Sequence, residues 1–188
     1  MEAHALTYGK AAAYIYKGMA ELFDTTELMS VLRDLARDAE AGYKDLLKQH
    51  GHIASGALYN SISTDIEVNG TTYTVWMNMA DMWKYVEYDT KPHWPPKDAI
   101  LNWIKIKPII PRPDSKGKIP TPETLAFLIG RAMAGQSPNQ ANLKNPHGGT
   151  TGTHDFRTSR DGVVAFYEER LLEALHRDAL NYIEKVLP

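Results

Sequence analysis

The chain has seven histidines, and two of them lie near an aspartate in a stretch rich in glycine and threonine. These three residues are His147, His154 and Asp155. Imidazole nitrogens and carboxylate oxygens are the ligands that zinc takes in hydrolases, where the metal activates a water molecule. A metal-dependent hydrolase built on these side chains is therefore one hypothesis. The spacing matches no recognised zinc motif such as H-E-x-x-H, so hydrogen-bonding or solvated histidines are the simpler interpretation.

Other catalytic patterns in the chain are incomplete. The run from Gly130 to Gly135 has the glycine spacing of a phosphate-binding loop, but Gln136 and Ser137 replace its Lys and Ser or Thr. That lysine supplies the positive charge for the phosphates, and Gly135 is better explained as the end of a helix. The chain also has no cysteine, which excludes a cysteine nucleophile, and no G-x-S-x-G nucleophile elbow. We therefore expect no catalytic residue, no metal, no cofactor and no enzymatic activity.

Aromatic residues are dense in the middle of the chain. Nucleic-acid bases stack on exposed rings in proteins that bind single strands, so a single-strand nucleic-acid-binding module is a second alternative. Such modules also use interleaved arginines, whereas the basic residues of this region are lysines. Packing in the core or between subunits is the simpler interpretation, because aromatic residues are enriched at interfaces. The rings belong to Trp76, Trp83, Tyr85, Tyr88, Trp94 and Trp103.

The composition is that of an ordinary globular domain. The chain has 188 residues, of which 43% are hydrophobic and 23% are charged, enough for one domain with a sizeable core. The formal net charge of −2 argues against a protein held on nucleic acid by a broad basic surface. The absence of cysteine excludes a disulfide scaffold and a cysteine zinc site. Neither a signal peptide nor a membrane-spanning apolar run is expected.

Two helices are predicted before the first strand. Residues 3–22 are rich in alanine and carry apolar residues at helical spacing, which indicates a helix. Asp24 is the expected N-cap of the second helix, with Glu27 three residues later as in a capping box. This second helix should end near Gly51 and bury one apolar stripe. The stripe consists of Leu28, Val31, Leu32, Leu35, Ala39, Tyr43, Leu46 and Leu47.

A β-hairpin that turns on Asn69-Gly70 is predicted next. Both residues tolerate the positive φ angles that a type I′ turn needs. A two-residue loop at this point pairs Ile66 with Tyr73. One face of the hairpin is then mostly apolar and the other mostly polar, so we expect a sheet with one buried and one wetter side.

The second half of the chain is predicted to be helical, with one long polar loop. Prolines bound a helix over 95–107, and Thr121 caps another helix that runs to Met133. We expect these helices to form an insertion over 95–135, followed by a polar interaction loop over 136–155. A final helix over about 161–187 carries an apolar stripe. That stripe consists of Val164, Tyr167, Leu171, Leu175, Ala179, Tyr182 and Val186, widened by Leu172, Ile183 and Leu187.

Short motifs along the chain resemble those of one protein family. A T/S-G-x-L-x-x-S-I segment is matched by Ser55, Gly56, Leu58, Ser61 and Ile62. The hairpin with its turn at Asn69 and Gly70 follows. A Y-V-E-F/Y-G-T segment is then matched by Tyr85, Val86, Glu87, Tyr88 and Thr90. These motifs, in this order, resemble those of the small neck and tail-completion proteins of tailed bacteriophages.

Later segments are similar to the same family, so the resemblance covers about residues 50–185. Pro95 to Lys107 resembles P-P-x-x-A-I-x-x-W-I-x-x-K, and Leu125 to Met133 resembles L-A-F-L-I-x-R-x-I. A G-T-x-x-F segment before the final helix is matched by Gly152, Thr153 and Phe156. The chain departs from the pattern at Asp89, where the family has glycine; aspartate tolerates turns better than most residues.

The resemblance implies a structural virion protein and no catalyst. It implies a head-tail connector or minor tail protein that forms a homo-oligomeric ring at the neck, around the DNA path. A portal-side adaptor or stopper and a tail tube or hub protein would be its neighbours, and no membrane is involved. The protein would be made in the cytoplasm of the bacterial host and end in the virion.

Together, these patterns predict a single α+β domain. A small antiparallel sheet should pack on long N- and C-terminal helices, with the helical hairpin inserted over 95–135. Closure of a ring requires two different patches of neighbouring subunits to meet.

A ring on the DNA path must let DNA pass without holding it tightly. The chain has 21 Lys and Arg against 23 Asp and Glu, so few phosphates would be neutralised. We expect no measurable duplex binding at physiological salt and only weak binding at very low salt. A salt titration with a labelled duplex checks this, because each phosphate contact adds about −0.9 to the salt slope. Submicromolar binding with a steep slope would contradict it.

Overall fold

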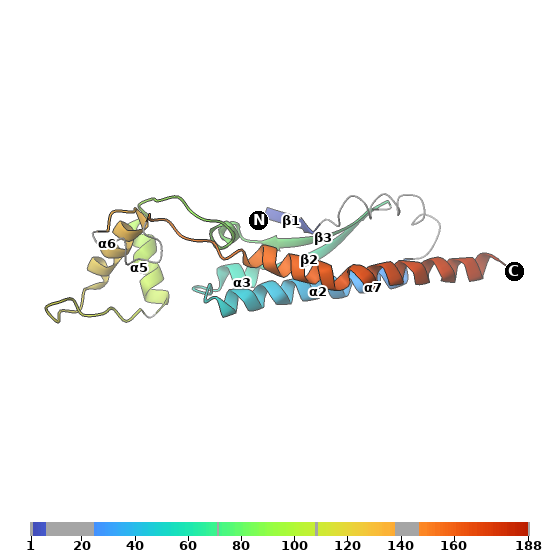
Figure 1. Ribbon diagram of the computed structural model, residues 1–188, viewed down its shortest axis with the longest axis horizontal. Helices are drawn as coiled ribbons and strands as arrows, with labels where there is room; N and C mark the ends of the chain where they lie inside the picture. Colours follow the sequence, from blue (N-terminus) through green and yellow to red (C-terminus); the bar gives the residue numbers. More distant parts are fainter. Residues whose placement is uncertain (1, 7–24, 71, 108, 138–146, 188) are drawn as a thin grey trace. The chain divides into compact units, whose positions relative to one another are not determined.

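The computed structural model describes residues 2–6, 25–70, 72–107, 109–137 and 147–187 (Figure 1). The fold is α+β, as predicted, with one antiparallel sheet and long helices. The chain divides into two compact units. The first unit comprises residues 1–50, 57–81 and 155–188, and the second comprises 51–56 and 82–154. The insertion expected over 95–135 lies inside the second unit.

The sheet of the first unit has three antiparallel strands in the order β1-β3-β2. These strands are β1 (Glu2–Leu6), β2 (Ser63–Asn69) and β3 (Thr72–Met79). The predicted helix over 3–22 is wrong at residues 3–6, because β1 pairs with β3 along the edge that β2 leaves open. Pairing with a strand far away in the sequence overrides the helix preference of alanine. The rest of that predicted helix and the predicted cap Asp24 lie outside the described residues.

The hairpin register differs from the predicted one. Asn69 ends β2 and pairs with Thr72, so the loop begins at Gly70 instead of at Asn69. Gly70 has φ +59°, whereas Asn69 is not among the described residues with positive φ; the predicted type I′ turn over Asn69-Gly70 is therefore wrong. The observed register places Ile66 opposite Val75, which puts two β-branched side chains together on the buried face.

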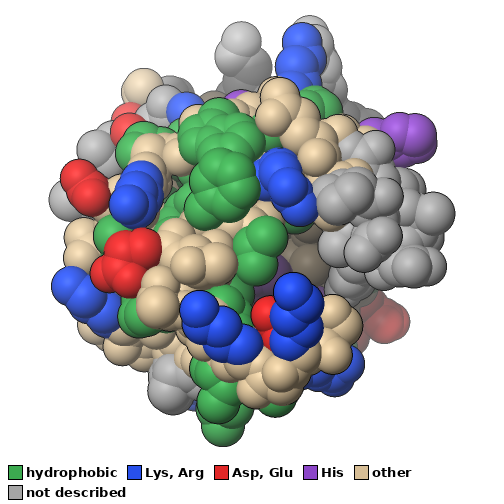
Figure 2. Space-filling model, turned by 90° about the vertical axis from the view of Figure 1, so that its left-hand side faces the viewer, with side chains coloured by type: hydrophobic (Ala, Val, Ile, Leu, Met, Phe, Trp, Pro, Cys, Tyr) green, Lys and Arg blue, Asp and Glu red, His purple; other side chains and the backbone are tan. Residues whose placement is uncertain are grey.

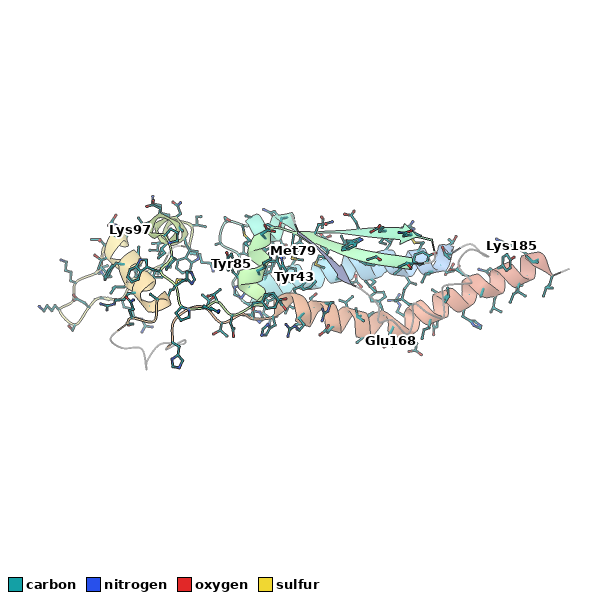
Figure 3. All side chains as sticks on the ribbon, turned by 90° about the horizontal axis from the view of Figure 1, so that it is seen from above. Tyr43, Met79, Tyr85, Lys97, Glu168 and Lys185 are labelled. Atoms are coloured by element: carbon teal, nitrogen blue, oxygen red, sulfur yellow. The ribbon has the colours of Figure 1, made fainter. Side chains whose placement is uncertain are left out.

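The core of the first unit lies between the sheet and two antiparallel helices. These are α2 (Thr26–Gln49) and α7 (Asp155–Val186), which lie side by side along most of α2 (Figure 1). From the sheet, Met77 and Met79 are 1% and 0% exposed, and Tyr43 of α2 is 0% exposed (Figure 3). Burial of such side chains stabilises the fold by about 1.5–3 kcal/mol each.

The first turn of α2 is capped by a side chain from α7. Thr25 occupies the N-cap position but makes no side-chain cap bond. Instead the buried carboxylate of Asp178 accepts hydrogen bonds from the amides of Glu27, at 3.0 Å, and Leu28, at 2.9 Å. These amides have no partner within the helix, and a negative charge at this end is favoured by the helix dipole. Asp178 therefore fixes where α7 lies along α2.

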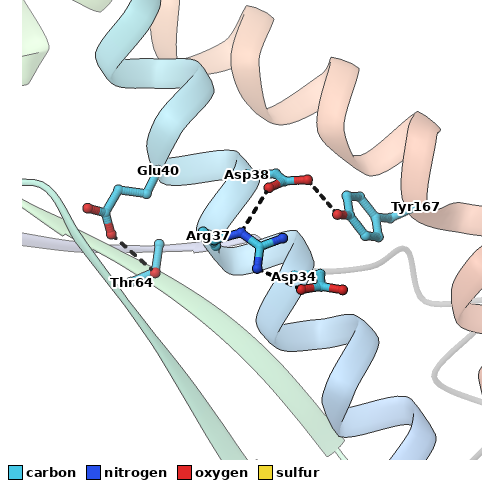
Figure 4. Close-up of polar contacts among 6 residues, drawn as sticks. All are labelled: Asp34, Arg37, Asp38, Glu40, Thr64 and Tyr167. Atoms are coloured by element: carbon cyan, nitrogen blue, oxygen red, sulfur yellow. Dashed lines mark hydrogen bonds and ion pairs between the residues drawn. The ribbon is translucent and has the colours of Figure 1, made fainter.

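Two further contacts couple the middle of the same helices. The hydroxyl of Tyr167 donates to Asp38 at 2.5 Å (Figure 4). The hydroxyl of Ser159 donates to the carbonyl of Ala39 at 3.3 Å, and a Cβ on Gly42 would lie 2.9 Å from that hydroxyl oxygen. A larger residue at position 42 would therefore force the Ser159 hydroxyl to move from this position.

The network around Tyr167 extends along the surface of α2. Asp34 and Asp38 flank Arg37, and their charges raise the pKa of its guanidinium (Figure 4). On the other side of α2, Glu40 accepts a hydrogen bond from Thr64 of β2 at 3.4 Å. Polar contacts thus link α2 both to α7 and to the sheet.

The apolar stripe predicted on the last helix is confirmed only in its middle. Tyr167, Leu171 and Leu175 are buried. Further along, Ile183, Val186 and Leu187 are 46%, 56% and 65% exposed. The reason is length: Asp178 already reaches the first turn of α2, so the residues after it extend beyond the start of that helix. The helix also begins earlier than predicted, at Asp155.

The second unit contains a short helix and a helical hairpin. The short helix is α4 (Lys84–Glu87), preceded by a 3₁₀ turn at Asp81–Trp83. The hairpin helices are α5 (Lys97–Ile106) and α6 (Pro122–Met133), and both were predicted. As expected, Thr121 caps α6 by accepting the amide of Thr124 at 3.3 Å.

The hairpin of the second unit is closed by close packing at Gly130 of α6. A Cβ at this position would lie 3.4 Å from the ring of Trp94 and 3.5 Å from Ile100 of α5. Ile100 and Ala126 are 6% and 1% exposed. This core is small, and much of the surface around it remains apolar.

Leu175→Asp tests the core between α2 and α7. Leu175 is 8% exposed, so an unpaired charge there should cost at least about 3 kcal/mol of unfolding free energy. Leu172→Asp is the matched control, because Leu172 lies on the same helix and is 55% exposed; its cost should stay below about 1 kcal/mol. Urea denaturation of both variants gives the comparison, and equal losses would contradict the packing.

The Tyr167–Asp38 contact predicts a dependence of stability on alkaline pH. Burial, then the hydrogen bond and charge of Asp38, raise the pKa of Tyr167 above its ordinary value of 10.0. The folded protein holds this proton more tightly than the unfolded chain, so the stabilisation is complete below pH 10.0 and is lost as pH rises above it. Tyr167→Phe should cost about 1 kcal/mol at neutral pH and flatten the alkaline decline.

Tyr85→Phe provides the control for that measurement. Tyr85 is 69% exposed, so its removal should change neither the stability at neutral pH nor the slope above pH 10. Chemical denaturation at several alkaline pH values distinguishes the two variants. An unchanged slope in Tyr167→Phe would show that the contact does not form.

Candidate functional site

The residues that carry the family resemblance are the candidate functional residues. The first group surrounds α3 (Ala57–Ser61). Gly56 precedes this helix with φ +77°, a conformation that favours glycine, and Leu58 is 6% exposed. The hydroxyl of Ser61 donates to the carbonyl of Leu58 at 2.8 Å and accepts the amide of Ala80 at 2.9 Å. This motif therefore anchors α3 to the end of β3.

The second group of motif residues forms a clamp within the second unit. We use "motif clamp" for residues 86–90 together with residues 149–153. The amide of Thr90 donates to the carbonyl of Thr150 at 2.9 Å, and the amide of Thr150 donates to the Thr90 hydroxyl at 2.8 Å. At the other end, the amide of Thr153 donates to the carbonyl of Val86 at 2.8 Å. The clamp joins segments about 60 residues apart in the chain.

Glycines allow the two segments of the motif clamp to approach each other. A Cβ on Gly152 would lie 2.5 Å from the carbonyl oxygen of Glu87. A Cβ on Gly149 would lie 2.0 Å from the carbonyl oxygen of Thr90. Both obstacles are backbone atoms, so no side-chain movement could relieve the clash. The sequence signal at Gly152 is thus explained by close backbone contact.

Asp89, where the chain departs from the family pattern, has its own role in the clamp. Its carboxylate accepts the amide of Gly152 at 2.9 Å, and it is not among the described residues with positive φ. No glycine is needed at position 89 in this conformation. Glu87 is 2% exposed, whereas Tyr85 and Tyr88 are 69% and 47% exposed. The two tyrosine rings of the motif therefore face outward.

The polar loop expected over 136–155 is partly ordered by the clamp. Residues 138–146 lie outside the described residues. After them, the amide of Gly149 donates to the carbonyl of Met133 at 2.7 Å, and the residues up to Thr153 follow the clamp. Asp155 already belongs to α7. Within the predicted interaction loop, backbone amides of residues 149–153 thus have partners.

Phe156, the last motif residue, fixes the beginning of α7 on α2. It is 7% exposed and meets the ring of Tyr43 edge to face, with centroids 5.8 Å apart. One residue earlier, the fully buried carboxylate of Asp155 is hydrogen-bonded to Nδ1 of His50 at 2.7 Å. His50 is the C-cap residue of α2. Sequence reasoning missed this pair, because its members are 105 residues apart.

The residues of the hydrolase hypothesis have separate surroundings. Asp155 is part of the first unit, where it contacts His50. His147 and His154 belong to the second unit; His147 is exposed, and His154 has φ +56° directly before α7. His52, in the second unit, bonds to the hydroxyl of Thr153 at 3.1 Å. Among these side chains, Asp155 is thus hydrogen-bonded to His50 and His52 to Thr153.

The six aromatic rings do not share one environment. Trp83 is 4% exposed and packs edge to face against Tyr88 at 5.8 Å. Trp76 lies on β3, where its indole donates to Glu67 at 2.6 Å. Trp94 and Trp103 are 48% and 40% exposed, and Trp94 stacks obliquely on Phe127 at 5.6 Å. Packing therefore accounts for part of the aromatic density, and part of it remains on the surface.

A groove of about 750 Å³ lies along α2 beside β2 and α3. Several of its cations lie against acids or rings. Lys44 bonds to Glu40 at 2.6 Å, and Lys48 lies 5.1 Å from the centre of the Tyr59 ring. The groove therefore carries charges of both signs.

No protein-family model, no curated protein and no solved structure matches this chain. Among the described helices, none is both long and apolar enough to cross a membrane.

Gly152→Ala tests the motif clamp. The added methyl group would meet the backbone of Glu87 and Tyr88, so the clamp must open, at a cost of about 2 kcal/mol or more. Gly162→Ala is the control: nothing lies within 4 Å of its Cβ position on α7, and this variant should gain up to about 1 kcal/mol. Thermal unfolding measures both. Equal behaviour of the two variants would contradict the clamp.

Proposed function

We propose that this protein is a structural virion subunit of a tailed bacteriophage, which forms a homo-oligomeric ring at the head–tail neck around the DNA path. The proposal assigns it a geometric role, with no substrate and no chemical step. A portal-side adaptor or stopper and a tail tube or hub protein are its proposed neighbours.

The observation that carries the proposal is the way in which the motif residues meet. The Y-V-E-Y-D-T segment and the G-T segment before the last helix resemble family motifs independently, yet they bond to each other in the motif clamp. Their polar groups are backbone amides, carbonyls, hydroxyls and one carboxylate, and they hold the chain in place. Motif residues used in this way support a structural protein.

The exposed apolar side chains give further support. Aliphatic and aromatic residues are 40–91% exposed on both units, which is typical of surfaces that other proteins cover. A ring subunit needs such surfaces for its neighbours on either side and for the virion proteins above and below it. Figure 2 shows hydrophobic side chains grouped on the face around α5 and α6.

Virions lacking this protein test the proposed function. A phage with a stop codon early in the gene should produce DNA-filled heads and separate tails, because the junction cannot form. Electron microscopy of the lysate counts joined particles, and expression of the chain in trans should restore them. Normal joined virions without the protein would contradict the proposal.

Labelling of wild-type virions is the second test of the proposed function. An antibody against the chain should mark one position per particle, between head and tail. Detection in infected cells but not in purified virions would contradict a structural role.

A further inference from the structure

The two units of the chain carry opposite charge, although the whole chain is almost neutral. Residues 82–154 contain ten Lys and Arg but only five Asp and Glu, whereas the remaining residues contain eleven and eighteen. The charge of the whole chain, −2, hides this separation. Opposite charge on two parts of one subunit favours contact between neighbouring copies, since unlike surfaces attract and like surfaces repel.

The positive charge gathers on the loop between α5 and α6. We use "loop tip" for Ile110, Arg112, Lys116, Lys118 and Ile119. Every residue from 112 to 119 is exposed, and Ile110 and Ile119 are 91% and 61% exposed. Within the described residues, Arg112, Lys116 and Lys118 form no ion pair. The loop tip therefore offers cations without ion pairs beside exposed aliphatic side chains.

Hydrogen bonds within the loop tip define its turn. Oδ1 of Asp114 accepts hydrogen bonds from the amides of Lys116 and Lys118, both at 2.9 Å. The amide of Gly117, at φ +77°, donates to the Asp114 carbonyl at 2.9 Å. A preordered turn reduces the conformational entropy lost on binding. Asp114 keeps its negative charge, so its one acid and three cations give residues 112–119 a net charge of +2.

The sheet of the first unit has a surface whose charge is opposite to that of the loop tip. We use "outer sheet face" for the side of β2 and β3 that carries Asp65, Glu67, Trp76 and Asn78. The buried side chains Val75, Met77 and Met79 point to the opposite face. None of the three strands contains Lys or Arg. The outer sheet face is therefore acidic, with one large ring at its centre.

The acids of the outer sheet face are held in place and remain free of ion pairs within the described residues. Asp65 uses one carboxylate oxygen to accept Asn78 at 2.7 Å. Glu67 uses one to accept the indole N–H of Trp76 at 2.6 Å. Each carboxylate keeps a second oxygen, and the Trp76 ring can take a lysine or an isoleucine against its face. These groups match the composition of the loop tip.

We propose that the loop tip of one copy docks on the outer sheet face of a second copy of this chain. The contact joins two different patches, which is the type of interface from which a ring is built. The inference rests on the proposed ring function and names the surfaces that form the ring. The exposed isoleucines favour a protein partner over nucleic acid, whose backbone offers phosphates but no apolar surface to cover them.

Salt-dependent assembly of the purified full-length chain is the first measurement. Light scattering after size-exclusion chromatography gives the mass at several protein concentrations, at about 50 mM and about 500 mM salt. We expect oligomers at low salt and at least about tenfold weaker association at high salt. A monomer at every concentration in both salts would overturn the inference. Virion labelling could still succeed in that case, so the two failures are distinguishable.

A charge-reversal series identifies the surfaces. Lys116→Glu with Lys118→Glu should weaken association at least about tenfold, as should Asp65→Lys with Glu67→Lys. All four changes in one chain should restore association to within about threefold, because reversed surfaces attract again. If the quadruple variant associates as weakly as the two double variants, these surfaces do not meet.

Matched controls separate a specific contact from a change in net charge or in folding. Arg33→Glu with Lys185→Glu changes the net charge by the same amount as Lys116→Glu with Lys118→Glu. Both of its residues are exposed and lie in the first unit, so association should not weaken. Asp65→Asn with Glu67→Gln removes the charge while keeping the oxygens that accept Asn78 and Trp76. This variant should melt like the parent and still associate at least about threefold more weakly.

A labelled duplex and a labelled single strand complete the test. If Lys116→Glu with Lys118→Glu abolishes binding of either probe while the changes at Asp65 and Glu67 leave assembly intact, the loop tip serves nucleic acid and the inference is overturned. The inference is supported if neither probe binds and assembly is restored in the quadruple variant.

Discussion

The register between α2 and α7 is the constraint on which the first unit depends. Four contacts, spread from one end of α2 to the other, fix this register. Asp178 caps the beginning of α2, Tyr167 and Ser159 reach its middle, and Asp155 meets His50 at its end. Each contact would be lost if α7 slid by one turn. Apolar side chains alone tolerate such a slip better than hydrogen-bonded groups with defined directions do.

The register also determines what the rest of the unit can do. The sheet packs on α2, and Glu40 of α2 reaches Thr64 of β2, so the position of α2 sets the position of the hairpin. The start of α7 is fixed by Phe156 on Tyr43, so the last helix begins at a defined point of α2. The outer sheet face, one of the two surfaces proposed to meet in the ring, therefore rests on this helix pair.

Local patterns made much of this fold predictable. Helical periodicity identified α2, α5, α6 and the middle of α7, and the cap at Thr121 was visible in the sequence because it involves neighbours. Two features depend on long-range partners. Residues 2–6 follow β3 instead of their own helix preference, and Asp178 caps α2 from 150 residues away. Long-range partners of this kind leave no periodic signal.

The candidate site was predictable in its residues but not in its contacts. Gly56, Ser61, Gly152 and Phe156 were recognised from motif resemblance, and each has a definite structural role. That Gly152 lies against the backbone of Glu87 could not be read from either segment alone. The charge separation between the units was equally hidden, because net charge averages over surfaces that face different neighbours.

The cap that Asp178 places on α2 has a consequence for how the chain folds during synthesis. The second unit is nearly continuous in sequence, whereas the first is assembled from segments near both ends. As the chain emerges from the ribosome, residues 82–154 can complete their contacts while the amides at the start of α2 still lack their acceptor. Closure of the first unit must wait for the last helix, and its high contact order makes that step slow. A chain whose synthesis stops before Asp178 would thus carry a folded second unit and an unpacked first unit. The exposed surfaces of such a chain favour premature association.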